Sequence, residues 1–156
     1  KDGSLDYPDE VLRKLNVRVC AIHSALGMSR KEMTERICTA LENEHLDILG
    51  HPSGRKLGER EACAIDFEKV FKCAADNGKI LEVNCQPLRL DLNDVHVFNA
   101  RKHGCLFSID TDSHATGHLG YMKYGVWQAR RGWLEKSDVI NTLPYSKLKK
   151  KLPNLP

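Results

Sequence analysis

Four apolar runs of the sequence each end on side chains that bind metal ions or make strong hydrogen bonds. These residues are His23, His51, Asn84 and the pair Asp112 and His114. Imidazole nitrogens combined with a carboxylate form a ligand set that Zn²⁺ and Mn²⁺ accept. We therefore expect His23, His51, Asp112 and His114 to bind metal, and the pattern favours a metal-dependent hydrolase.

Polar residues next to these positions are candidates for a supporting role. Asp110 lies two positions before Asp112, so on a strand both carboxylates point to the same face. Asp110 is therefore expected to be an additional ligand or to orient one. Asn84 and Gln86 either orient substrate and ligands or only complete the hydrogen bonds of a turn. His118 follows the Asp112 loop and is a weaker candidate.

The apolar runs are predicted to be β-strands that alternate with helices. The runs cover residues 17–24, 46–52, 80–86 and 105–114. The residues at their ends are 28, 33 and 28 positions apart, about the length of one strand–helix unit. Parallel strands place their carboxyl ends at one edge, so the candidate residues should meet there. Since a closed barrel has about eight such units, we predict an α/β fold that is either part of a barrel or a small open sheet.

Helices are expected between and after these strands, with Ser29, Asp66 and Asp91 as their N-terminal caps. The side chains expected to face the core recur at helical spacing. They are Met33, Ile37, Ala40 and Leu41, then Phe67, Val70, Phe71, Ala74 and Ala75, then Leu92, Val95 and Phe98, and finally Leu119, Met122, Val126, Ala129 and Trp133.

The composition is that of one soluble globular domain spanning residues 1–156, with 41% hydrophobic and 29% charged residues. A net charge of +3 neither requires nor excludes a nucleic-acid partner. The tail 137–156, which contains three prolines, is expected to form a short cap and a fraying end.

The six cysteines form no C-x-x-C pair, and no secretory signal is present. We therefore expect reduced thiols and a cytoplasmic protein. No apolar stretch approaches the roughly 20 residues needed to cross a bilayer, so we expect no membrane span.

Longer stretches of the sequence are similar to a known family. The stretches are AIHS, LGHPSGRKLGERE, LEVNCQPLRLDLNDV, DTDSH and MKYGVWQARRGWLEKSDVINTLP. Together they resemble the C-terminal part of the PHP (polymerase and histidinol phosphatase) domain attached to bacterial and archaeal family X DNA polymerases. The ordered set, above all QPLRLDLND and ARRGWLEKSDVINTLP, is specific to the polymerase X branch.

The resemblance implies a distorted (βα)7 TIM-like barrel with a cluster of up to three metal ions, usually Mn²⁺ or Zn²⁺. It also implies a phosphoesterase of DNA repair, acting as 3′-5′ exonuclease, AP endonuclease or 3′-phosphatase. By position, His23 and His51 match two histidines that share one metal. Asp112 matches the carboxylate of a second metal and His114 the histidine of a third, and both are implied to be catalytic.

The same resemblance implies that this chain is the C-terminal portion of the barrel. The family's H-x-H pair, two further histidines and a bridging glutamate are expected before Lys1. The expected partners are this upstream half of the PHP domain, the polymerase domain and DNA. On its own the chain is expected either to dimerise or to have had its upstream residues disordered, cleaved or omitted, and in both cases to be nearly inactive. Asp110 stands where the family has a small polar residue, which could perturb the metal cluster.

Metal-assisted hydrolysis of a phosphoester needs metal ligands more than a nucleophilic side chain. Arg55, Arg89, Arg130 and Arg131 are candidates for contacts with phosphate or DNA, because guanidinium groups pair with phosphate through two hydrogen bonds. Structural ion pairs are the alternative for these arginines.

Two other functions stay open. One is a small-molecule phosphatase of the histidinol-phosphatase type, and the other is a catalytically inactive structural PHP domain that positions the polymerase. The motifs of the polymerase branch favour the nuclease over the small-molecule phosphatase. The inactive domain would be distinguished from both enzymes by the sequence before Lys1, because a parent protein without the H-x-H pair would be inactive.

Overall fold

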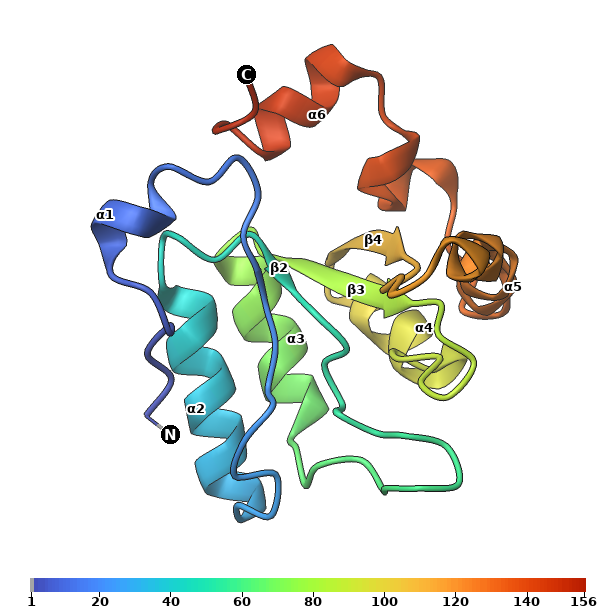
Figure 1. Cartoon of the computed structure of the whole chain (residues 1–156). Coiled ribbons are helices and arrows are strands. Elements are labelled where there is room, and N and C mark those ends of the chain that lie inside the picture. The colour runs from blue at the N-terminus through green and yellow to red at the C-terminus, as the bar shows by residue number, and fades with distance from the viewer. Residues whose placement is uncertain (1) are drawn as a thin grey trace.

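The computed structural model describes residues 2–156 and contains one sheet of four parallel strands in the order β1-β2-β3-β4 (Figure 1). The strands are β1 (Val19–Cys20), β2 (Ile48–Leu49), β3 (Ile80–Asn84) and β4 (Leu106–Asp110). Each lies inside one of the four apolar runs. The predicted α/β fold with parallel strands is therefore confirmed.

The register of the sheet brings the predicted strand ends to one edge. Ile48 of β2 lies opposite both Val19 of β1 and Ile80 of β3. At the other end, Asn84 of β3 lies opposite Asp110 of β4. Since the strands are parallel, the polar residues that follow them leave the sheet at its carboxyl edge.

β1 and β2 are shorter than the apolar runs that contain them. The Gly50 amide still donates a hydrogen bond of 2.8 Å to the Cys20 carbonyl, one residue beyond β2. The chain then turns away at His51, whose φ angle is +28°. Such a backbone angle is unusual for a residue other than glycine, and it ends the strand there.

Helices precede, connect and follow the strands. They are α1 (Asp9–Leu12), α2 (Arg30–Glu42), α3 (Phe67–Asp76), α4 (Asp94–Lys102), α5 (Met122–Arg131) and α6 (Tyr145–Lys151), with the 3₁₀ helices η1 (Thr116–Tyr121), η2 (Lys136–Asp138) and η3 (Ile140–Thr142). The caps predicted for α2 and α3 are confirmed, because Ser29 accepts a hydrogen bond from the Glu32 amide and Asp66 accepts one from the Lys69 amide.

The cap predicted for α4 was wrong. Asn93, not Asp91, precedes the helix, and its side chain accepts a hydrogen bond of 2.8 Å from the His96 amide. Asp91 is instead fully buried and binds backbone amides of another loop. From the sequence alone, an acidic residue shortly before an apolar helix can be a helix cap or an acceptor for backbone amides elsewhere. Only the tertiary structure distinguishes these two roles.

The inward faces predicted for α4 and α5 were also partly wrong. Several side chains expected in the core are exposed, namely Val95, Phe98, Leu119, Met122, Val126 and Trp133. The residues buried in α5 are Gly125, Gln128 and Ala129. This helix therefore approaches the sheet through Gly125 and Ala129, with the polar Gln128 also buried, and its larger apolar residues face outward.

Consecutive helices lie side by side across the sheet (Figure 1). α2 packs on α3, α3 on α4 and α4 on α5, while α5 also contacts β3 and β4. The strand order follows the chain without reversal. Helices that follow one another around an unreversed parallel sheet are typical of a barrel wall, whereas a doubly wound sheet reverses its strand order.

A buried ion pair joins the segments that lead into β1 and β2. Arg18 Nε lies 2.7 Å from Asp47 Oδ2, and Arg18 Nη2 lies 2.7 Å from Asp47 Oδ1. Both side chains are almost completely buried. Two parallel hydrogen bonds of this kind fix the mutual position of the strands they precede.

The outer edge of β4 is covered by the segment after α5. The side-chain amide of Asn141 accepts a hydrogen bond of 2.9 Å from the Ile109 amide and donates one of 2.9 Å to the Ile109 carbonyl. Val139 also forms a parallel bridge with Phe107. A side chain thus occupies the positions that a fifth strand would use.

The tail 137–156 is helical and covers the amino ends of the strands. Leu152 is 4% exposed and packs in a small apolar cluster with Ile48, Ile80 and Ile140. This cap lies at the end of the sheet opposite the candidate residues. Among residues 2–156, no helix combines the length and apolar character needed to cross a bilayer, and the six cysteine thiols are free.

The close packing of α5 gives a first prediction. A methyl group at Gly125 would lie 2.2 Å from Cys85 Sγ and 2.7 Å from Ile109 Cγ2, both buried. Gly125→Ala should therefore destabilise the protein by about 1–3 kcal/mol in urea unfolding, despite the better helix propensity of alanine. Gly120→Ala is the control, because nothing lies within 4 Å of its added carbon. Equal stability of the two variants would contradict this packing.

Candidate metal centre

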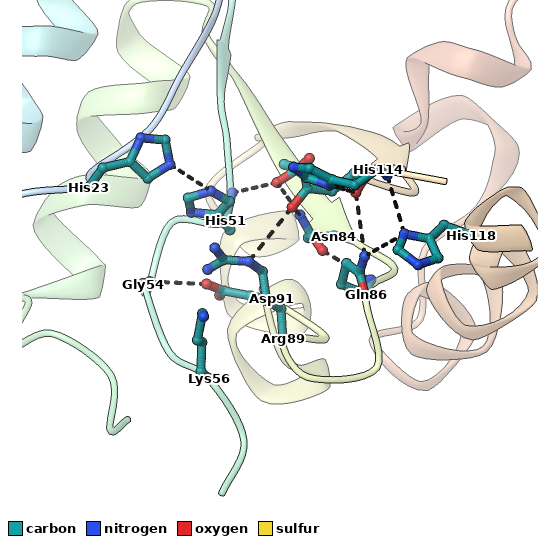
Figure 2. A network of polar contacts seen from close by, with 12 residues as sticks. His23, His51, Gly54, Lys56, Asn84, Gln86, Arg89, Asp91, His114 and His118 are labelled. Atoms are coloured by element: carbon teal, nitrogen blue, oxygen red, sulfur yellow. Dashed lines mark hydrogen bonds and ion pairs between the residues drawn. The ribbon is translucent and has the colours of Figure 1, made fainter. Parts of the chain in front are cut away.

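The predicted site residues meet at the carboxyl edge of the sheet, as Figure 2 shows. His23 follows β1 and His51 follows β2, and their Nε2 atoms face each other at 3.3 Å. Asn84 ends β3, and Asp112 comes two residues after β4. The four strands therefore contribute side chains to one region, as the sequence predicted.

The two histidines are arranged as ligands of one metal ion would be. Two nitrogens bound to a tetrahedral zinc at about 2.0–2.1 Å are roughly 3.3 Å apart, which agrees with the observed separation. Burial, together with the nearby Arg89 and His23, lowers the pKa of His51 to about 4. His51 is therefore neutral near pH 7, and the neutral imidazole is the form that binds metal.

Glu82 holds His51 from within the sheet. Its carboxylate is buried in β3 and accepts hydrogen bonds from the His51 amide and from Asn84 Nδ2. Burial raises the pKa of Glu82 to about 7, although these two donors oppose the shift. Glu82 was not among the site residues predicted from the sequence. The sequence did contain one indication of its role, because Glu82 is a charged residue inside an apolar strand. A buried charge of this kind needs a hydrogen-bond or ion-pair partner.

Asn84 connects this carboxylate to Asp112. Its Nδ2 atom lies 3.2 Å from Glu82 Oε2 and 3.2 Å from Asp112 Oδ2. Arg89 approaches the same Asp112 oxygen with its Nε at 3.7 Å. Asp112 has a φ angle of +49°, so it shares the left-handed backbone seen at His51. Such strained positions concentrate at functional sites and persist only when neighbouring contacts hold them.

His114 lies apart from the histidine pair. Its side chain is 75% exposed, and its Nδ1 lies 2.8 Å from the Asp112 carbonyl oxygen and 3.9 Å from Asp112 Oδ1. In residues 2–156, no three or more His, Cys, Asp or Glu side chains are grouped as ligands of a single ion. The structure therefore brings His23 and His51 together, and places Asp112 and His114 elsewhere on the lining of the same cavity.

His118 is closer to the site than the sequence analysis expected. Its Nδ1 accepts a hydrogen bond of 3.2 Å from the His114 amide and lies 3.3 Å from Gln86 Nε2. Gln86 Nε2 also lies 3.4 Å from the Asp112 carbonyl (Figure 2). Because Nδ1 accepts from a backbone amide, the proton of the neutral ring is on Nε2.

Of the four candidate arginines, Arg89 lines the cavity at the site, and the other three do not. Its Nη1 is buried and has no hydrogen-bond partner among the described residues, so a donor is left for an anion. Arg55 donates instead to the backbone carbonyls of Arg89 and Leu90. Arg131 pairs with Asp94 at 2.6 Å, and Arg130 is exposed on α5.

Asp110 and Asp91 have structural partners. The Ser108 hydroxyl donates to Asp110, and Asn141 Nδ2 lies 3.5 Å from its other oxygen. Asp91 Oδ2 accepts from the amides of Ser53 at 3.0 Å and Gly54 at 3.1 Å. Burial raises the pKa of Asp91 to about 6, opposed by these hydrogen bonds. Asp91 thereby fixes the loop that follows His51, a role the sequence analysis missed.

The site opens into a cavity of about 660 Å³. His23, His51, Glu82, Arg89 and Asp112 line one part of it. The other walls come from the segment before α1 and from the start of β1. Imidazole and carboxylate groups at one wall, with the unpaired Nη1 of Arg89 beside them, are suited to a metal ion and an anionic substrate.

The chain is similar to the DNA polymerase/3'-5' exonuclease PolX of Bacillus subtilis (strain 168), with 39% identity over 140 residues. The match covers 90% of this chain and 25% of that protein. The resemblance to a PolX-type PHP domain is thereby confirmed. A probable phosphatase of Thermoanaerobacter sp. (strain X514) is 24% identical over 151 residues, which cover 91% of this chain and 59% of the phosphatase.

A probable phosphatase of Acetivibrio thermocellus is 32% identical over 84 residues, or 53% of this chain and 32% of that protein. No protein-family model matches the sequence. The chain therefore spans a quarter of the polymerase and a little over half of the first phosphatase.

The loop held by Asp91 gives a second prediction. Asp91→Ala leaves the buried amides of Ser53 and Gly54 without an acceptor, so it should destabilise the protein by about 2–4 kcal/mol. Urea unfolding measures this loss. Asp76→Ala, which removes an exposed carboxylate paired with Lys72, should change stability little. If both variants unfold alike, Asp91 does not hold the loop.

Proposed function

We propose that the chain is a metal-dependent phosphoesterase module of a family X DNA repair polymerase, acting on DNA as a 3′-5′ exonuclease, AP endonuclease or 3′-phosphatase. The observation that carries this proposal is the pair His23 and His51, whose Nε2 atoms face each other at 3.3 Å beside the unpaired Nη1 of Arg89. The names of the relatives support the same chemistry, since an exonuclease and a phosphatase both hydrolyse phosphoesters.

His23 and His51 would hold one Mn²⁺ or Zn²⁺ ion, with Asp112 and His114 as ligands of neighbouring ions. When bound, such ions supply an activated water and neutralise charge on the phosphate. The ligand types suit these metals, because imidazole and carboxylate are accepted by both. Glu82 would orient His51 through its backbone amide, as hydrogen-bonded groups behind metal ligands commonly do.

The remaining side chains would bind and orient the substrate. Arg89 has a buried Nη1 without a partner and would donate it to a phosphate oxygen. Asn84 keeps the Asp112 carboxylate in place through its Nδ2. His118, with its proton on Nε2, can donate a hydrogen bond toward a group bound near His114.

The four strands would be part of a distorted (βα)7 barrel. The unreversed strand order and the successive packing of α2 to α5 support this reading. The partners would be the other barrel half, a polymerase domain and DNA, in the cytoplasm. Without that half, two copies would associate through the sheet and cavity that it would otherwise cover.

A small-molecule phosphatase is the second candidate function. Several relatives are named as probable phosphatases, and the cavity of about 660 Å³ can accommodate a small phosphate ester. The two candidates differ in substrate. A phosphatase of this kind would release phosphate from soluble monoesters and leave single-stranded DNA intact.

The histidine pair gives a prediction for metal binding. This chain should bind at most one Zn²⁺ or Mn²⁺ ion through its own side chains, and weakly, as measured by titration calorimetry. His23→Ala and His51→Ala should each weaken that binding by more than roughly tenfold. His103→Ala is the matched control, because His103 pairs with Glu68 away from the site. Three tightly held ions per chain would contradict the assignment.

The proposed catalytic residues give a prediction for activity. In a PolX-type protein that carries this chain, Asp112→Ala or His114→Ala should abolish Mn²⁺-dependent degradation of single-stranded DNA and leave nucleotide addition unchanged. The loss follows because each change removes a proposed metal ligand. His103→Ala should retain both activities. Wild-type degradation by either of the first two variants would refute their roles.

A further inference from the structure

A stripe of aromatic rings leads away from the candidate metal centre. His118, Tyr121, Tyr124 and Trp127 recur at every third position. Successive ring centroids are 4.9, 6.0 and 5.6 Å apart. Residues three apart eclipse one another in a 3₁₀ helix and are neighbours in an α-helix, so the stripe runs continuously from η1 into α5.

The outer part of the stripe is not used for packing. Tyr121 packs against the main core, whereas Trp127 is 56% exposed. The His118 and Tyr121 rings are nearly parallel, with 21° between their planes. Tyr124 and Trp127 meet edge to face at 75°. The faces of these two outer rings are therefore not stacked on each other.

The surroundings of the stripe are basic. From Ser113 to Trp133 the sequence contains no Asp or Glu. Lys123 Nζ lies 5.1 Å from the centroid of the Tyr124 ring, and Arg130 is exposed on the same helix. Neither cation forms an ion pair with any residue in the described part of the chain. The charge of this surface is complementary to a polyanion.

The stripe is continuous with the proposed site. His118, its first ring, accepts the His114 amide at 3.2 Å and lies 3.3 Å from Gln86 Nε2. Gln86 in turn lies 3.4 Å from the Asp112 carbonyl. A ligand lying along the rings would reach the metal centre at the His118 end.

We propose that the outer rings of this stripe, Tyr124 and Trp127, form a stacking platform for the bases of single-stranded DNA, and that the stripe guides the end of the strand past His118 into the site. Proteins bind single strands by stacking bases on exposed aromatic rings while cations follow the phosphates. This surface has both the rings and the cations. Tyr124 and Trp127 are the accessible rings, and Lys123 and Arg130 are the cations. A protein partner of apolar surface would leave both cations unpaired. This inference rests on the proposed function.

The experiment measures binding of a fluorescent oligothymidine strand by anisotropy, with a chelator present to prevent cleavage. Trp127→Ala should weaken binding by about tenfold or more, because base stacking on the ring is lost, and Trp127→Phe should restore most of it. A strand of abasic residues with the same length should bind weakly and equally to all variants. Trp133→Ala is the matched control, as this tryptophan is 70% exposed but lies outside the stripe.

A second readout separates this inference from the proposed function. Hydrolysis of bis(p-nitrophenyl) phosphate with Mn²⁺ by a PolX-type protein that carries this chain should be unchanged in Trp127→Ala, since this substrate has a single phosphate and does not extend along the stripe to Trp127, the ring farthest from His118. Absent hydrolysis in a PolX-type protein that carries the wild-type chain, with ring-dependent DNA binding retained, would overturn the proposed function alone. Equal DNA affinity of wild type and Trp127→Ala would overturn the platform. Loss of self-association in that variant, without a change in DNA binding, would also overturn it and assign the stripe to protein contact.

Discussion

The carboxylate of Glu82, buried inside β3, is the constraint on which the arrangement of the site depends. A buried carboxylate is costly unless donors surround it, so the groups that satisfy it cannot move freely. Those groups are the His51 amide and the Asn84 side chain. The first fixes a histidine in a left-handed backbone conformation, and the second fixes Asp112. A polar group in the middle of the sheet thus sets the positions of side chains on the loops beyond it.

Much of the fold could be predicted from local patterns. Apolar runs at regular spacing gave the parallel strands, and capping residues gave the start of α2 and α3. The faces of α4 and α5 were mispredicted, because helical spacing identifies apolar side chains but not the distance at which a helix packs. Gly125 lets α5 approach so closely that small residues fill the interface and larger ones are left outside.

The positions of the site residues were predictable, and their partners were not. His23 and His51 end successive strands, so their meeting follows from the parallel sheet. Asp91 and Arg55 could not be assigned, since each bonds to backbone groups more than 30 residues away. The sequence around Asp91 equally allows a helix cap, and the sequence around Arg55 equally allows a phosphate contact. His118 was undervalued because its place beside His114 depends on how the loop folds back.

The side-chain amide of Asn141 forms hydrogen bonds with both backbone groups of Ile109, and this makes the two edges of the sheet differ in how open they are to another strand. Free backbone donors and acceptors at a sheet edge are templates for another strand, in growth of the same sheet or in aggregation. On the β4 side that template is partly occupied by a side chain and by Val139. The β1 edge, where Val19 is 56% exposed, is therefore the edge more open to a further strand.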